Sequence, residues 1–204
     1  MEKFGTIIFG GAFNPPTIAH LLNVKYLVDS LDFENFIVMP TGNPPHKEIE
    51  CLDDESRFEL AKISFEEIKG VSVSDYEFKN PGESFTFKTL EHFKNIYEDL
   101  SIVVGMDSFL SLPQWRKADE IIRLARVIVL RRGGYEFKGH DLYEAHKDRF
   151  VFIDNPIFEM SSSFVRDRLK AGKDVRFYVS DRAYEFLKKI DFKEVCGCTQ
   201  ETRP

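Results

Sequence analysis

Two side chains that can contact phosphate lie three residues apart near the N-terminus. Thr17 and His20 follow a run, residues 10–16, that opens with Gly10-Gly11 and ends in two prolines. On the first turn of a helix these side chains point the same way, and the free N–H groups there attract phosphate oxygens. Glycines let a ligand approach the backbone closely. The segment predicts a phosphate site, and it equally fits a tight strand-to-helix turn with a partly buried histidine.

Two later segments carry charged side chains suited to phosphate or ribose. His46 and Lys47 follow two prolines, which hold a stiff, extended chain and keep both side chains at one place. Lys47 either binds phosphate or is a solvated surface lysine. Asp107 follows the predicted strand 101–105, where a carboxylate can accept hydrogen bonds from ribose hydroxyls or cap a helix.

A serine run and a lone tryptophan complete the candidate set. Ser161-Ser162-Ser163 can cap a helix that carries Arg166, whose planar guanidinium can grip phosphate with two hydrogen bonds. The alternative for Arg166 is a surface ion pair with Asp167 or Asp181. Trp115 follows a proline and can stack on a flat heteroaromatic ring, or it can simply pack in the core.

Short apolar runs alternate with amphipathic stretches along the whole chain. We expect strands at residues 6–9, 36–39, 71–73 (with an extension to Tyr76), 102–104, 127–130 and 150–153. We expect helices at 18–31, from Asp53 or Asp54 to about 68, and at 86–97, 118–124, 162–171 and 181–190. This alternation predicts an α/β fold with a doubly wound parallel sheet and a site outside the carboxyl ends of the strands.

The 204 residues predict one domain, 1–204, whose helical part 161–190 carries the serine run and Arg166. The net charge of −6 argues against a nucleic-acid partner, and no apolar run is long enough to span a membrane. The three cysteines, Cys51, Cys196 and Cys198, suggest neither a disulfide framework nor a metal site, so we expect a cytoplasmic protein. A homo-oligomer is compatible with the sequence but is indicated by no motif.

The first segment resembles the HxGH-type nucleotidyltransferases, in the form with Thr in place of the first His. Further segments are similar to motifs of the nicotinate or nicotinamide mononucleotide adenylyltransferases, so the resemblance runs nearly the whole length. These segments are residues 40–47 (PxxxPPHK), 84–90 (SYTxxTL), 104–108 (GxDS), 112–115 (LPxW), 160–166 (ISSTxIR) and 172–179 (GxxVRYLVP). The resemblance implies a Rossmann-like nucleotidyltransferase fold.

Four positions depart from the family pattern. Ala19 replaces the usual Gly before the second His, and Asn14 replaces Asp. Phe85 replaces the Tyr of SYTxxTL, and Gly133 follows Arg132 where the family has Pro. Asn14 with Thr17 is similar to the amide-accepting branch of the family, whereas the PPHK and LPxW segments and the length look like the acid-preferring branch.

The resemblance implies transfer of the adenylyl group of ATP to nicotinate mononucleotide, with release of pyrophosphate, in NAD biosynthesis. It makes His20, Arg166 and Lys47 the catalytic residues. Mg²⁺ would arrive with ATP, without a metal site of the protein's own. The implied binding residues are Gly10, Gly11, Phe13, Asn14, Thr17, His46, Thr86, Gly105, Asp107, Trp115, Arg132, Ser162 and Ser163.

Four other functions remain open at this point. The acceptor could be nicotinamide mononucleotide, and a sister enzyme would act on phosphopantetheine or a cytidylyl substrate. A nucleotide sensor of the same fold would bind ATP without turnover, although His20 and Arg166 argue against it. An α/β interaction module would need all of these motifs to be structural accidents.

Overall fold

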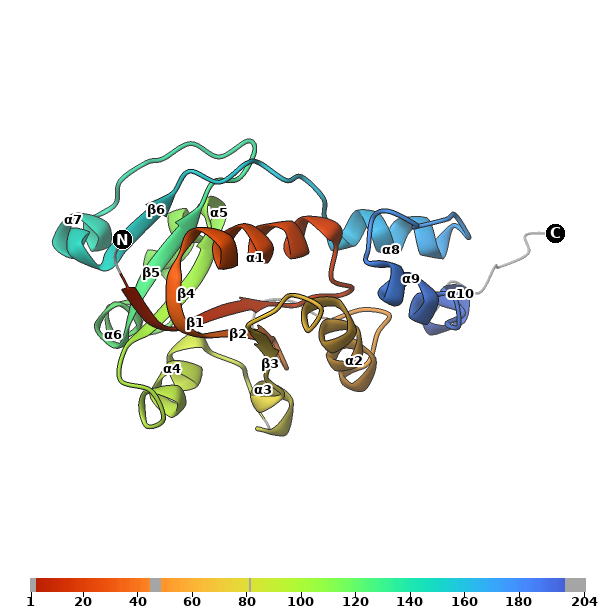
Figure 1. Ribbon diagram of the computed structural model, residues 1–204, viewed down its shortest axis with the longest axis horizontal. Helices are drawn as coiled ribbons and strands as arrows, with labels where there is room; N and C mark the ends of the chain where they lie inside the picture. The colour runs from red at the N-terminus through yellow and green to blue at the C-terminus, as the bar shows by residue number, and fades with distance from the viewer. Residues whose placement is uncertain (1–2, 45–48, 81, 197–204) are drawn as a thin grey trace.

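The structure, a computed structural model, describes residues 3–44, 49–80 and 82–196. Six parallel strands form one sheet in the order β3-β2-β1-β4-β5-β6 (Figure 1). The strands are β1 (Lys3–Gly11), β2 (Asp32–Pro40), β3 (Val71–Val73), β4 (Leu100–Gly105), β5 (Ala125–Leu130) and β6 (Phe150–Ile153). The chain leaves the centre in one direction and returns to build the other half. The predicted doubly wound sheet is therefore confirmed.

Helices cover both faces of the sheet, as the alternating pattern predicts. The principal helices are α1 (Ile18–Ser30), α2 (Asp54–Phe65), α4 (Thr86–Lys94), α6 (Ala118–Leu124), α8 (Ser162–Lys170) and α9 (Asp181–Leu187). Each lies where a helix was predicted, with ends shifted by a few residues. Shorter helical segments are α3 (Tyr76–Lys79), α5 (Met106–Ser111), η1 (Leu112–Gln114), α7 (Asp141–Ala145), η2 (Lys147–Arg149) and α10 (Phe192–Val195).

Alternate side chains of the central strand pack on opposite faces. Ile8 joins a cluster with Phe93 of α4 and Ile121 of α6. Its neighbour Ile7 joins a second cluster with Leu27 of α1, on the other face. Because both faces are covered, the strands are almost continuously apolar, which is the pattern from which they were predicted.

Local signals set several helix ends. Asp53 caps α2, because its carboxylate accepts from the Ser56 amide at 2.8 Å, and Ser161 caps α8 by accepting from the Phe164 amide. Gly172 follows α8 with a φ of 66°, a left-handed conformation that glycine adopts at little cost. The expected extension of the third strand to Tyr76 is wrong, because Tyr76 begins α3. Asp75 provides the N-cap position of this one-turn helix.

The last three helices form a third apolar cluster at one end of the molecule, next to α2 (Figure 1). Val165 of α8, Leu187 of α9 and Phe192 of α10 share this cluster with Leu60 of α2. A disulfide between Cys51 and Cys196 crosses the same region. This bond corrects the expectation that the cysteines form no disulfide. The two cysteines are 145 residues apart in the sequence, so no local spacing indicates the pairing. In the described part of the chain, no helix is long and apolar enough to cross a membrane.

Candidate active site

A cavity of about 830 Å³ opens at the carboxyl ends of the central strands. This is the crevice in which open α/β sheets bind their ligands, because the chain leaves β1 and β4 in opposite directions there. The residues that line the cavity include Gly10, Gly11, Phe13, His20, Glu77, Thr86, Gly105, Trp115, Arg132 and Ser161. The sequence predicted most of these positions.

The turn that precedes His20 holds its ring in one tautomer. The Thr17 amide donates to His20 Nδ1 at 3.0 Å, and the Thr17 hydroxyl lies 2.8 Å from the same nitrogen. An Nδ1 that accepts leaves the ring proton on Nε2. Burial, aided by the charge of Arg132, lowers the pKa of His20 to about 4. At neutral pH His20 is thus a neutral imidazole with one N–H to donate in the cavity.

Thr17 has a different place from the one expected. We predicted that it would contact phosphate, but its side chain is completely buried and is bonded to His20. Its physical role is to orient the histidine at the start of α1. The turn behind it is equally fixed: Phe13 has a φ of 42° and packs edge-on against the His20 ring, with ring centroids 5.3 Å apart.

The two glycines at the end of β1 differ in what they allow. A Cβ on Gly11 would lie 2.8 Å from the Phe13 ring, so only glycine fits there. A Cβ on Gly10 would meet no protein atom within 4 Å. Its backbone lines the cavity and is open to a ligand, as the sequence predicted.

Arg166 is buried behind the cavity, where it joins α8 to the β1–α1 turn. Its guanidinium donates to the Asn14 carbonyl at 2.8 Å and to the Ser163 hydroxyl at 3.2 Å. With 7% exposure, it is not the surface ion-pair residue of the alternative prediction. Ser162 adds a second link, since its hydroxyl donates to the Pro15 carbonyl at 2.8 Å. Arg166, Asn14, Ser162 and Ser163 therefore lie around the turn and not on the cavity wall.

On the other side of the cavity, Arg132 and Asp107 form an ion pair of 2.8 Å. Asp107 lies in the first turn of α5 and is folded back on Gly105, at which a Cβ would lie 2.5 Å from the carboxylate. The remaining oxygen of Asp107 is buried, and no partner for it exists among the described residues. The predicted ribose-binding carboxylate is thus next to the cavity, paired with a predicted nucleotide-binding arginine.

The side of the cavity near α4 carries an aromatic ring and polar groups. Trp115 and Thr86 both line the cavity here, as the sequence predicted. Thr86 is the first residue of α4, and no side chain caps this helix within the described ranges. Amides at an uncapped helix start can donate to an anion. This side can therefore bind a flat ring with an anionic substituent.

Sequence reasoning missed two residues that shape the same region, the half-buried Glu77 and the fully buried Arg57. Glu77 accepts from the Thr89 hydroxyl at 2.7 Å and from the Gly42 amide at 3.2 Å, and burial raises its pKa. Arg57 is fully buried in α2 and donates to the carbonyls of three residues at the ends of β1 and β2: Ala12, Thr41 and Gly42. Sequence patterns assign a charged residue of an amphipathic helix to the solvent-exposed face, so no local pattern indicates that Glu77 and Arg57 have these contacts.

His46 and Lys47, two of the predicted site residues, lie outside the described residues. Among the residues that are described, no group of three or more His, Cys, Asp or Glu side chains could hold a metal ion. The described site offers a fixed N–H donor, backbone amides, an exposed guanidinium and an aromatic ring. These groups can bind phosphates and flat rings, and they can stabilise negative charge that moves between phosphate oxygens.

Comparisons with known proteins agree with this geometry. Residues 8–168 match the model of the family described as cytidylyltransferase-like. A probable nicotinate-nucleotide adenylyltransferase of Clostridium tetani is 32% identical over 190 residues, which are 89% of this chain and 95% of the relative. A protein of the same name from Caldicellulosiruptor saccharolyticus is 33% identical and covers 92% of this chain and 98% of its own.

Solved structures share the fold. The nicotinic acid mononucleotide adenylyltransferase of Plasmodium falciparum, in complex with NaAD, superposes with a TM-score of 0.76 over 94% of this chain and 98% of its own, at 17% identity. A putative nicotinate-nucleotide adenylyltransferase of Vibrio parahaemolyticus gives 0.68 over 93% and 94% of the two chains, at 24% identity. Family model, relatives and fold agree: the chain belongs to the nicotinate-nucleotide adenylyltransferases of the cytidylyltransferase-like family.

Proposed function

We propose that this protein transfers the adenylyl group of ATP to nicotinate mononucleotide, forming nicotinate adenine dinucleotide and pyrophosphate. The observation that carries the proposal is His20, a neutral donor with a fixed proton in the wall of a crevice that Gly10, Gly11 and Arg132 also line. Phosphoryl transfer needs in-line positioning and charge stabilisation, which such a donor supplies.

In the proposed reaction the 5′-phosphate of the mononucleotide attacks the α-phosphorus of ATP. The bond from this phosphorus to the bridging oxygen breaks, and pyrophosphate leaves, so no protein nucleophile is needed. His20 Nε2–H donates to the phosphate oxygens as charge moves onto them. The backbone amides at the start of α8 would serve the departing β- and γ-phosphates, and Arg166 would hold this helix start against the β1–α1 turn from behind. We keep His46 and Lys47 as residues that bind the incoming phosphate.

Mg²⁺ would accompany the triphosphate as part of the substrate. It prefers phosphate oxygens and water to a cage made by protein side chains, and it would neutralise charge on the β- and γ-phosphates. Asp107 and Gly105 would bind the adenylate ribose. The ion pair between Arg132 and Asp107 would open, so that the Arg132 guanidinium could bind the nucleotide.

Nicotinate is the preferred acceptor because the uncapped start of α4 offers backbone amides to its carboxylate. Nicotinamide mononucleotide is the second candidate, and Glu77 is the observation in its favour. This carboxylate lines the cavity and could accept from an amide N–H. Against it, Glu77 already accepts from Thr89 and Gly42.

Incubation with ATP, Mg²⁺ and each mononucleotide tests the proposal, with pyrophosphate release and the mass of the dinucleotide as readouts. We expect turnover with nicotinate mononucleotide and a kcat/KM about tenfold or more above that for nicotinamide mononucleotide, since one mismatched buried polar contact costs on the order of 1–3 kcal/mol. Preference for the amide would favour the second candidate. Turnover only with phosphopantetheine or CTP would assign a sister reaction, and ATP binding without turnover would indicate a sensor.

The proposed partners are ATP and the pyridine mononucleotide, with neither nucleic acid nor membrane. We place the reaction in the cytoplasm, and a homo-oligomer is compatible with it. The helical part 161–190 would contribute to ATP binding through Ser162, Ser163 and Arg166. This proposal is supported by the position of α8 beside the β1–α1 turn.

A further inference from the structure

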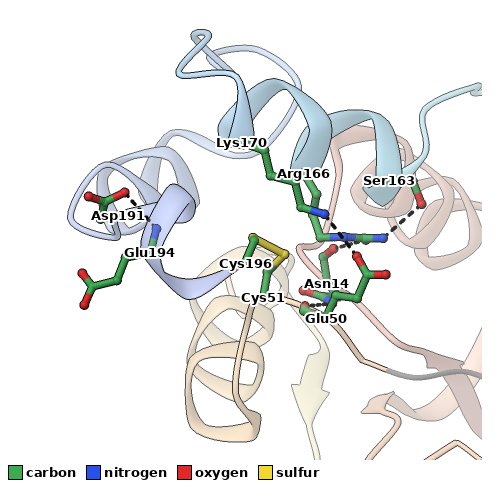
Figure 2. Close-up of a disulfide and its surroundings, with 9 residues drawn as sticks. All are labelled: Asn14, Glu50, Cys51, Ser163, Arg166, Lys170, Asp191, Glu194 and Cys196. Atoms are coloured by element: carbon green, nitrogen blue, oxygen red, sulfur yellow. Dashed lines mark hydrogen bonds and ion pairs between the residues drawn. A yellow bond between two sulfur atoms is a disulfide. The ribbon is translucent and has the colours of Figure 1, made fainter. Parts of the chain in front are cut away.

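The disulfide connects two segments that are far apart in sequence and adjacent to Arg166. Cys51 lies just before α2, and Cys196 directly follows α10. Figure 2 shows the bond beside Glu50, Asn14 and Arg166. Both cysteines are partly exposed, so a small dithiol or an exposed protein dithiol could reach the bond.

The backbone at Cys51 needs support from its surroundings. Cys51 has a φ of 69°, and the Leu52 amide donates across it to the Glu50 carbonyl at 2.8 Å. A turn this tight with positive φ at a residue other than glycine is unfavourable by itself and persists only where contacts hold it. The bond to Cys196 is one such contact. Burial of Leu52 in the cluster with Val165 and Phe192 is another.

The carbonyl in this turn connects directly to the proposed ATP site. Asn14 Nδ2 donates to the Glu50 carbonyl at 2.7 Å, and the Asn14 carbonyl accepts from Arg166 at 2.8 Å. Lys170, one turn beyond Arg166 on α8, pairs with the Glu50 carboxylate at 3.2 Å. A shift of the turn at Cys51 would therefore reach Arg166 through two hydrogen bonds and one ion pair.

We propose that Cys51 and Cys196 are a reversible thiol–disulfide site, and that their bond strengthens ATP binding by holding Glu50 and Asn14 against Arg166. The proposal rests on the proposed ATP site. In the cytoplasm, where we place the protein, a disulfide is characteristically transient and redox-sensing. The site is therefore suited to exchange with a dithiol reductant.

The exchange is balanced by the dithiol. One thiolate of the reductant attacks one sulfur of the Cys51–Cys196 bond, and the other cysteine leaves as a thiolate that takes up a proton. The second thiolate of the reductant then attacks the first reductant sulfur in this mixed disulfide, and the remaining protein cysteine leaves as a thiolate that takes up a proton. The reductant leaves as its own disulfide, and the protein gains two electrons and two protons as two thiols. A disulfide oxidant runs the same steps in reverse. Cys198, two residues from Cys196 in the sequence, is the thiol that must be controlled in any experiment.

The test compares the oxidised and the dithiol-reduced full-length protein. Peptide mapping without reduction establishes the pairing, and calorimetry gives the Kd for ATP without requiring turnover. We expect reduction to weaken ATP binding by about 2- to 10-fold, the effect of one weakened hydrogen bond, with a smaller change for the mononucleotide. A fall in Tm of about 5 to 15 °C should accompany it, because the bond closes a long loop.

Variants distinguish two effects of reduction. One is transmitted from Glu50 to α8 through Asn14 and Lys170, a connection that we call the relay, and the other is a general loss of stability. Cys51→Ser and Cys196→Ser should each bind ATP like the reduced protein and should not respond to dithiol, whereas Cys198→Ser should keep the full response. The double variant Asn14→Ala/Lys170→Ala removes both the Asn14 hydrogen bond to Glu50 and the ion pair, so its ATP affinity should be the same in both redox states while its Tm still falls on reduction.

Equal ATP affinities in the oxidised and reduced wild-type protein would overturn the proposal, as would mapping that pairs Cys198 in place of Cys51 or Cys196. A persistent response in Asn14→Ala/Lys170→Ala would overturn the relay. If no substrate gives pyrophosphate but ATP affinity still depends on the bond, the proposed reaction fails and the redox site stands.

Discussion

The two walls of the cavity differ in how their side chains are held: one by buried polar contacts, the other by partly exposed ion pairs. The turn wall, comprising Gly10, Gly11, Phe13 and His20, rests on buried polar contacts from Thr17, Arg57 and Arg166. The β5 wall, residues 131–135, holds its two arginines in partly exposed ion pairs, Arg131 with Asp154 and Arg132 with Asp107. Exposed pairs contribute about 0–1 kcal/mol, so they exchange readily for a ligand. One wall is fixed before the substrate arrives, and the other is free to adapt.

Removal of the donor on the turn wall should have the largest effect. We expect His20→Ala to lower kcat by ~10²–10³, the loss typical of one preorganised donor to developing charge. Steady-state kinetics with a circular-dichroism check of folding measure this. His92→Ala is the matched control, because His92 is exposed on α4 and does not line the cavity. A folded His20→Ala enzyme with wild-type turnover would remove His20 from the mechanism.

The same histidine should make stability depend on pH. Its pKa is about 4 in the folded protein and about 6.5 when unfolded, so the unfolded chain binds the additional proton between these values. Stability should therefore fall as pH drops from about 6.5 to 4, by at most about 3 kcal/mol. Urea unfolding of the wild type and His20→Gln at pH 7 and pH 5 isolates this contribution. Equal losses in both proteins would mean that His20 is not buried in its neutral form.

Arg166→Lys tests the support behind the turn wall. Lysine keeps the charge but loses the planar fork that joins Asn14 to Ser163. We expect the KM for ATP to rise about tenfold, because hydrogen bonds of charged groups are worth roughly 1.5–3 kcal/mol, and the KM for the mononucleotide to change less. Arg168→Lys is the control, because Arg168 lies half-buried on the same helix and donates to the Asp174 carbonyl and not to the β1–α1 turn. An unchanged KM for ATP would limit Arg166 to a role outside the site.

The β5 wall should give the smallest effect. Arg132→Ala loses one partly exposed charge, so we expect kcat/KM to fall by about 2- to 5-fold, in keeping with pairs worth up to about 1 kcal/mol. Kinetics at low and high salt check this, because a screened interaction weakens with ionic strength. A loss as large as that of His20→Ala would contradict the contrast between the walls.

This contrast also explains what the sequence could predict. The strands and long helices have strong apolar periodicity. Gly10, Gly11 and Gly105 lie at the ends of β1 and β4, which the parallel sheet brings together, whereas His20 lies in the first turn of α1 and Trp115 follows η1. Thr17 and Arg166 were predicted to contact phosphate, but both are buried behind the turn, and this burial depends on packing between segments distant in sequence. Arg57, Glu77 and the Cys51–Cys196 bond depend wholly on such packing, so no local pattern indicates them.

The most direct test of the account follows the mononucleotide phosphate through the reaction. Nicotinate mononucleotide labelled with ¹⁸O in its 5′-phosphate is incubated with unlabelled ATP, Mg²⁺ and the enzyme, and both products are analysed by mass spectrometry. In the proposed reaction the turn wall holds the ATP α-phosphate, and the labelled phosphate attacks its phosphorus. The dinucleotide should therefore retain all of the label, and pyrophosphate should contain none. Label in pyrophosphate, or no dinucleotide at all, would contradict the account.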